Sequence, residues 1–167
     1  DGIASPWDEG MVVGPLTIIN STLANDQHLA VGAGTLTIKN SVIDSCGGGS
    51  YVFGSHTLIR DQRNACLRDG VNGNIVGEDP LLGPLADNGG STHTHALLPA
   101  SPAIDAGDDS RCEGMDQRGL PRSLDGNGDT VAHCDIGAYE ADGRPALRTL
   151  AATVQNLTNA RIDGLIV

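Results

Sequence analysis

Aromatic residues are scarce in this chain of 167 residues. Trp7, Tyr51, Phe53 and Tyr139 are the only four. The core must therefore be built from Val, Ile, Leu and Ala, which suits thin, repeated layers better than a thick sandwich. The apolar content of 39%, with 23 glycines and 8 prolines, fits one compact domain with many turns.

Basic residues are also few. Ten Lys and Arg residues, of which Lys39 is the only lysine, stand against 21 acidic residues and leave a formal net charge of −11. No basic patch exists to attract phosphate groups, which argues against nucleic acid and anionic membranes as partners. No apolar run reaches the roughly 18 residues of a membrane-spanning helix, so we expect no membrane insertion. The chain opens at Asp1 without a signal peptide, so a secreted protein would be in its mature or processed form.

A period of twenty residues runs through the first half of the chain. GPLTIINSTLAND (14–26) aligns with GTLTIKNSVIDSC (34–46), and GSHTLIRDQRNAC (54–66) follows as a weaker third copy. Twenty residues with alternating apolar side chains make one solenoid coil, which buries its inner face only when another coil stacks on it. Asn20 and Asn40 fall in register, which predicts a short ladder of amide side chains along the stack.

The four cysteines can form two pairs. In the twenty-residue register Cys46 and Cys66 occupy equivalent points of consecutive coils, and stacked strands lie about 4.8 Å apart, which a disulfide tolerates. This predicts a Cys46–Cys66 disulfide and, by elimination, a second one between Cys112 and Cys134. A metal site is the alternative, but the chain has no CxxC pair or Cys/His cluster of suitable spacing. Paired cysteines would place the protein outside the reducing cytoplasm.

The second half contains four strings that occur together in one family. They are DPLLGPLADNGG (79–90), THTHALLPASPAIDAG (92–107), DQRGLPR (116–122) and CDIGAYE (134–140). In this order they resemble the end of the bacterial surface proteins called choice-of-anchor Q domain proteins. The resemblance implies a right-handed parallel β-helix at the bacterial cell surface, and it implies no particular reaction.

The repeat and the resemblance together predict an all-β chain in three parts. Residues 1–78 are expected to form about three β-helix coils, with Ile75-Val76 as a last short strand. Residues 79–140 correspond to the family's C-terminal module. Its frequent prolines exclude long helices, so we expect an irregular wrap that covers the end of the solenoid and protects its strand edge. Residues 141–167 form a tail, expected to supply an extra strand or a contact between subunits.

The acidic turn DGNGD is the candidate for a cation site. Asp125, Asn127 and Asp129 place oxygen ligands at alternate positions, separated by glycines, which suits a hard cation such as Ca²⁺. The string is not an EF-hand, because Thr130 and Ile136 stand where that loop has glycine and glutamate. A glycine-rich acidic turn in solvent explains the same residues without a metal.

Other constellations that could carry chemistry are weak. His93 and His95 share one face of an extended segment but have no identifiable third ligand. Carboxylates are plentiful, yet β-helix lyases and glycosidases need aromatic platforms and basic residues, which are scarce here. Arg118 and Arg122 are expected to bond carboxylates or carbonyls inside the wrap. We therefore expect no enzymatic activity, and no cofactor other than calcium.

The tail carries no sorting motif, terminal membrane helix or basic cluster. Its last residues, Leu165, Ile166 and Val167, are too apolar to be left in water and are expected to contact another subunit. Short solenoids with unpaired edges can assemble head to tail into fibres, although a fragment of a longer surface protein would have the same open edges. The predicted function is therefore a secreted, non-enzymatic structural or adhesive protein of the cell surface. The alternative is a module that binds or cleaves extracellular polysaccharide.

Overall fold

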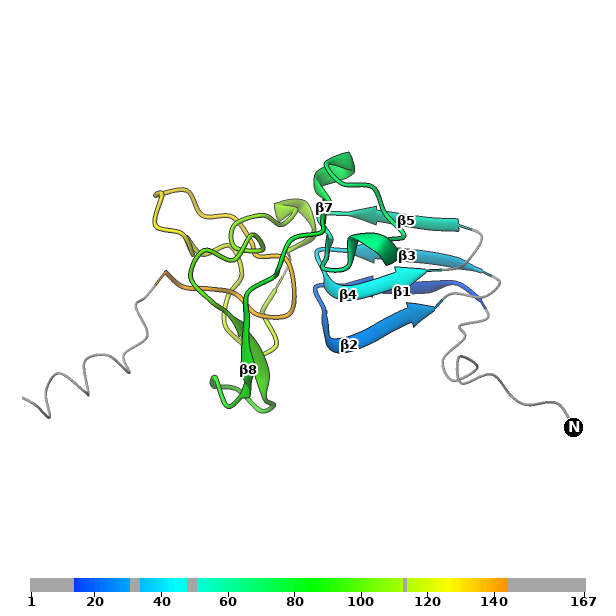
Figure 1. Ribbon diagram of the computed structural model, residues 1–167. Coiled ribbons are helices and arrows are strands. Elements are labelled where there is room, and N and C mark those ends of the chain that lie inside the picture. Colours follow the sequence, from blue (N-terminus) through cyan, green and yellow to red (C-terminus); the bar gives the residue numbers. More distant parts are fainter. Residues whose placement is uncertain (1–13, 31–33, 48–50, 113, 144–167) are drawn as a thin grey trace, which may run out of the picture.

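Two parallel sheets form a β-solenoid (Figure 1). The structure is a computed structural model that describes residues 14–30, 34–47, 51–112 and 114–143. The first sheet contains, in spatial order, β1 (Leu16–Ile19), β3 (Thr35–Lys39) and β5 (Tyr51–Ser55). The second sheet contains β2 (Thr22–Ala30), β4 (Val42–Gly47), β6 (Leu58–Ile59) and β7 (Ile75–Val76). The predicted all-β solenoid is confirmed, and β7 is the predicted last short strand.

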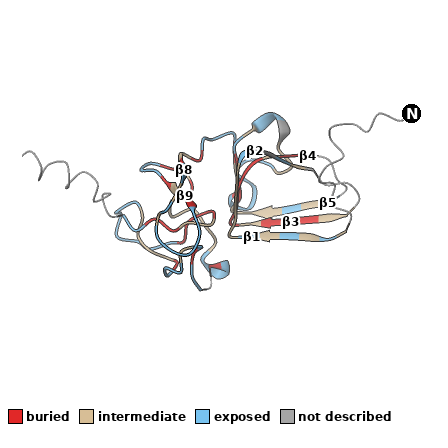
Figure 2. Cartoon of the chain, turned by 90° about the horizontal axis from the view of Figure 1, so that it is seen from below, coloured by how far each residue is buried: buried red, intermediate tan, exposed pale blue. Residues whose placement is uncertain are grey.

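Alternate residues of the strands point inward and form the core. Leu36 and Ile38 of β3 are fully buried, as are Ile43 of β4 and Ile59 of β6. Figure 2 shows β3 between β1 and β5, with buried and half-buried residues only, whereas both neighbours carry exposed segments. The core therefore runs along the stack as one narrow column of aliphatic side chains, as the scarcity of aromatic residues predicts.

The step from the second coil to the third is four residues shorter than the step from the first coil to the second. The first two coils keep the twenty-residue spacing throughout β1 and β3. Leu36 lies opposite Val52, however, and Val42 lies opposite Leu58, so the step to the third coil is sixteen residues. The predicted alignment of the third copy (54–66) is therefore wrong. The cause is that the alternating residues of YVFGS favour β structure and form β5 only a few residues after β4 ends.

The first three coils turn from the first sheet to the second at a residue with left-handed backbone conformation, and a fourth such residue lies between β6 and β7. These residues have φ between 45° and 53°, and they are, in chain order, Asn20, Asn40, His56 and Asn72. Asparagine adopts this conformation more readily than most residues. The amides of Asn20 and Asn40 donate to the backbone carbonyls of Arg111 and Asp108, each at 3.2 Å. The predicted amide ladder is therefore wrong, because these side chains hold the second part of the chain instead.

The irregular second part, which we call the wrap (residues 79–143), packs beside the solenoid (Figure 1). The amide of Gly137 donates to the carbonyl of Asn40 at 2.9 Å, and the amide of Ala138 donates to Thr22 Oγ1 at 3.0 Å. These contacts lie at the corners of the first two coils. The expectation that the wrap covers the end of the solenoid is therefore wrong. The wrap lies along the corners instead, because polar groups there accept hydrogen bonds from its backbone amides.

Little regular structure exists inside the wrap. It contains one antiparallel hairpin, β8 (Leu82–Ala86) and β9 (Thr94–Leu97), and a 3₁₀ turn, η3 (Asp109–Arg111). Two further 3₁₀ turns, η1 (Gln62–Asn64) and η2 (Val71–Gly73), belong to the solenoid. In the part of the chain that the structure describes, no helix is long and apolar enough to cross a membrane. A shared apolar cluster of Val42, Leu58, Leu97, Ala103 and Ile136 joins the wrap to the solenoid.

Candidate functional site

Both predicted disulfides are present. Cys46 pairs with Cys66 at a Cα separation of 5.3 Å, and Cys112 pairs with Cys134 at 6.2 Å. The pairing of Cys46 with Cys66 remains possible although the step to the third coil is only sixteen residues, because η1 follows β6 and adds a turn before Cys66. All four cysteines of the chain are therefore bonded, which indicates folding in an oxidising compartment.

The acidic turn directs its side chains toward its own backbone. Asp125 accepts hydrogen bonds from the amides of Gly128 at 2.6 Å and Thr130 at 2.9 Å. Asn127 Oδ1 accepts from the amide of Asp129 at 2.8 Å, and Asp129 Oδ1 accepts from that of the next valine at 2.8 Å. Across the described ranges, no group of three His, Cys, Asp or Glu side chains is placed to hold a metal ion. Calcium binding by this turn stays a prediction, since its oxygens would first have to exchange these backbone bonds for a cation.

A buried carboxylate holds the middle of the wrap. Asp116 accepts hydrogen bonds from the amides of Arg118 at 2.8 Å, Leu120 at 3.1 Å and Glu140 at 3.1 Å. Its second oxygen also accepts from Arg118 Nε at 2.8 Å. Burial raises the pKa of Asp116, but the backbone amides and the guanidinium outweigh it, so the pKa is lowered overall. Asp116 is therefore ionised and paired inside the wrap.

Arg118 and Arg122 confirm the prediction that they bond carboxylates and carbonyls. The Arg118 guanidinium donates to the carbonyl of Glu140 and lies 3.6 Å from the ring centroid of Tyr139. Arg122 Nη2 donates to the carbonyl of Gly137 at 3.0 Å. Its Nη1 lies 3.7 Å from Glu140 Oε2, an ion-pair distance that is too long for a hydrogen bond.

Two more carboxylates are buried beside Arg122. Glu140 accepts from the amides of Leu124 at 2.9 Å and Asp135 at 3.0 Å. Asp135 accepts from the amides of Asp105 and Ala141. Burial raises the pKa of Glu140, and burial together with the charges of Glu140 and Asp105 raises the pKa of Asp135 to about 7. These side chains satisfy backbone amides of a segment that lacks regular structure, so their chemistry serves the fold.

These pKa shifts predict that the protein is most stable at mildly acidic pH. The pKa of Asp135 is raised from 3.8 to about 7, so the folded state binds this proton more tightly and stability falls as pH rises between those values. The hydrogen bond to Asp109 raises the pKa of His133, so this group also makes the stability fall as pH rises. Asp116 has a lowered pKa, and its contribution is lost as pH falls through its folded pKa, below 3.8.

We therefore expect the melting temperature to be highest near about pH 4 and to fall by several degrees between about pH 5 and about pH 8. Thermal unfolding followed by circular dichroism across this range measures the effect. In Asp135→Asn the decline between the two pH values should shrink. A melting temperature that rises from about pH 5 to about pH 8 would contradict the assignment of a raised pKa to this buried carboxyl group.

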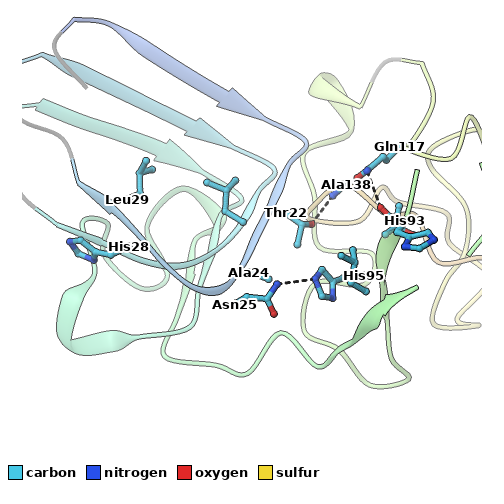
Figure 3. A pocket seen from close by; sticks show the side chains of 12 residues that line it. Thr22, Ala24, Asn25, His28, Leu29, His93, His95, Gln117 and Ala138 are labelled. Atoms are coloured by element: carbon cyan, nitrogen blue, oxygen red, sulfur yellow. Dashed lines mark hydrogen bonds between the residues drawn. The ribbon is translucent and has the colours of Figure 1, made fainter. Parts of the chain in front are cut away.

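A cleft of about 450 Å³ separates the wrap hairpin from β2 (Figure 3). The side-chain amide nitrogen of Asn25 lies 3.3 Å from Nε2 of His95. The other ring nitrogen of His95, Nδ1, lies 2.7 Å from the carbonyl oxygen of Gly83. Because a carbonyl only accepts, Nδ1 carries the proton and Nε2 accepts. His93 lines the same cleft, and its carbonyl accepts a bond from Gln117.

The histidine cleft does not assemble an acid/base pair. Its described lining contains no carboxylate, and His95 is engaged at both ring nitrogens. Figure 3 shows His28 away from His93 and His95, and its Nδ1 lies 2.8 Å from Ser45 Oγ. The cleft is therefore a seam between solenoid and wrap, held by single hydrogen bonds.

One predicted contact is left untested, and one pair of exposed residues was not predicted. Leu165, Ile166 and Val167, predicted as an assembly contact, lie outside the described residues. The outward position of Tyr51 and Phe53 on β5, with exposed fractions of 64% and 58%, was not predicted. The period-2 pattern of YVFGS contains that signal, because residues on either side of an inward valine must point outward.

Comparison of the chain with protein-family models, with curated proteins and with solved structures finds no match in any of the three. The resemblance to choice-of-anchor Q domain proteins therefore rests on the four sequence strings alone.

Proposed function

We propose that this protein is a secreted, non-enzymatic structural or adhesive module of a cell surface. The observation that carries the proposal is the use of the wrap's buried charges. Asp116, Asp135 and Glu140 all accept backbone amides, and both buried arginines bond backbone carbonyls. The buried charges of this chain bond its own backbone, and its two disulfides stabilise the fold further. Both features suit a stable protein outside the cell.

The same proposal includes head-to-tail assembly. Within the described residues, β1 and β2 are the outermost strands at one end of the stack, with no further strand beside them. An edge strand offers backbone amides and carbonyls to a strand of another molecule. Stacking of one solenoid end on another would repeat the contact without closing, which produces a fibre.

We expect negative-stain microscopy of the purified chain to show fibres. Ile19→Lys should reduce them strongly, because Ile19 lies on edge strand β1 and is 42% exposed, so a charge there opposes strand addition. Leu120→Lys is the matched control, since Leu120 is 41% exposed in the wrap and belongs to neither edge strand. Loss of fibres in a calcium chelator would include the acidic turn in the joint. Monodisperse particles in every condition would overturn the assembly.

We expect the protein to cleave no polysaccharide. Incubation with a panel of acidic and neutral polysaccharides, followed by assays for reducing ends and for unsaturated uronate products, should give no signal above buffer. Product that disappears in His93→Ala would instead assign a carbohydrate-cleaving activity to the histidine cleft and overturn the non-enzymatic role.

A further inference from the structure

The outer face of the first sheet carries two exposed aromatic side chains. Tyr51 and Phe53 project from β5, and Phe53 lies opposite Thr37 of β3. The other aromatic residue of the described chain, Tyr139, lies under Arg118 in the wrap. Exposing two of so few aromatic residues on one strand removes them from the core, where an aliphatic solenoid has no use for their width.

Phe53 borders a second cleft of about 450 Å³, which we call the β5 cleft. Its walls are β5 and the loop of residues 66–74. Gly54 permits this approach, because a Cβ at that position would lie 2.2 Å from a methyl carbon of Leu67. The buried amide of Asn74 fixes the loop by donating to the carbonyl of Gly54 at 3.3 Å and accepting from the amide of Thr57 at 3.2 Å. The cleft is therefore preformed between anchored segments.

The charge of the β5 cleft is opposite to that of the whole chain. Lys39, the only lysine, and Arg68 both line it, and none of the described residues of its lining is a carboxylate. Neither cation forms an ion pair with another described residue, in contrast to Arg118 and Arg122. In a chain of net charge −11, this is a local excess of positive charge beside an exposed aromatic ring.

These features match one class of ligand. A pyranose ring packs its C–H face on an aromatic ring, whose face is electron-rich. A carboxylate or sulfate on that sugar would meet Lys39 and Arg68 in charge-assisted hydrogen bonds. The exposed Asn72 and the half-buried Ser55 offer polar groups to its hydroxyls. We propose that the β5 cleft binds an anionic saccharide through Phe53, Lys39 and Arg68. This names a ligand for the adhesive role proposed above and rests on that role.

Binding of soluble polysaccharides to the immobilised full chain tests the inference. Polygalacturonate and dextran sulfate serve as the anionic probes, and dextran is the neutral probe. We expect binding of one or both anionic probes and none of dextran. Lys39→Gln combined with Arg68→Gln should weaken binding about a hundredfold or more, because the loss of each charged hydrogen bond weakens binding about tenfold or more. Phe53→Ala should weaken it about tenfold, and the preferred probe tells carboxylate from sulfate recognition.

Two control variants separate this site from the rest of the surface. Arg63→Gln removes an arginine that is 93% exposed in η1, outside the β5 cleft, and Leu85→Ala alters the histidine cleft. Both should bind like the unaltered chain. No binding of either anionic probe, or equal binding by the cleft variants and the controls, would overturn the inference. Assembly and cleavage are measured separately, so that result would leave the structural role standing.

Discussion

Replacing Asp116 by alanine is expected to lower the free energy of unfolding by about 3–5 kcal/mol. The side chain is completely buried, and its removal leaves the Arg118 guanidinium, itself 6% exposed, without its counter-ion at 2.7 Å. Three backbone amides also lose their acceptor, those of Arg118, Leu120 and Glu140. Each unsatisfied buried amide costs about 1–3 kcal/mol before any relaxation, so this is a site of large expected effect.

Chemical denaturation at neutral pH measures the loss, and Asp87→Ala is the matched control. Asp87 is exposed and accepts a single backbone bond, from Gly89 at 3.0 Å, so its removal should cost no more than about 1 kcal/mol. Asp116→Asn should fall between the two, because one amide oxygen can still accept while the amino group opposes the remaining donors. Equal stability of Asp116→Ala and Asp87→Ala would show that the buried network contributes nothing to the fold.

The solenoid was largely predictable because its signals repeat. Leu16 and Leu36 align at the twenty-residue spacing, and the alternation of apolar residues along β1 and β3 determines which side chains enter the core. The third coil was misaligned because matching glycine, threonine and apolar residues at a twenty-residue spacing outweighed the alternation of YVFGS. The corner residues would have corrected it. Asn40 and His56 are sixteen residues apart and share left-handed conformation, but a histidine at such a corner does not resemble an asparagine in sequence.

The position of the wrap could not be predicted in the same way. Its segments are held by side chains that accept hydrogen bonds from backbone amides, and residues that make such bonds do not recur at a regular spacing in the sequence. The roles of Arg118 and Arg122 were nevertheless predictable, because an arginine in a segment without helices or strands has carbonyls and carboxylates as its natural partners. The β5 cleft was missed for a physical reason. It depends on where the loop of residues 66–74 lies over β5, which only the fold determines.

The two disulfides offer a second large effect, with a contrast built into the chain. They span 20 and 22 residues, so the chain-entropy argument gives each of them about 3 kcal/mol of stabilisation. Their surroundings differ. Cys46 lies in β4, which is hydrogen-bonded to β2 on one side and to β6 on the other. Cys112 and Cys134 instead clamp an irregular segment, and Gly107 packs so closely that a Cβ there would lie 2.6 Å from Cys134 Sγ.

We therefore expect the pair of changes Cys112→Ala and Cys134→Ala to open the wrap before the solenoid unfolds. The free energy of unfolding should fall by about 3 kcal/mol, and limited proteolysis should cut between residues 112 and 134 under conditions where the unaltered chain stays intact. Cys46→Ala with Cys66→Ala should lose a similar free energy but gain no cut in that segment, because the Cys112–Cys134 disulfide still closes it and β4 still pairs with β2 and β6. Identical digestion patterns for the two double variants would mean that wrap and solenoid unfold as one unit, with the corner contacts of Asn40 and Thr22 strong enough to couple them.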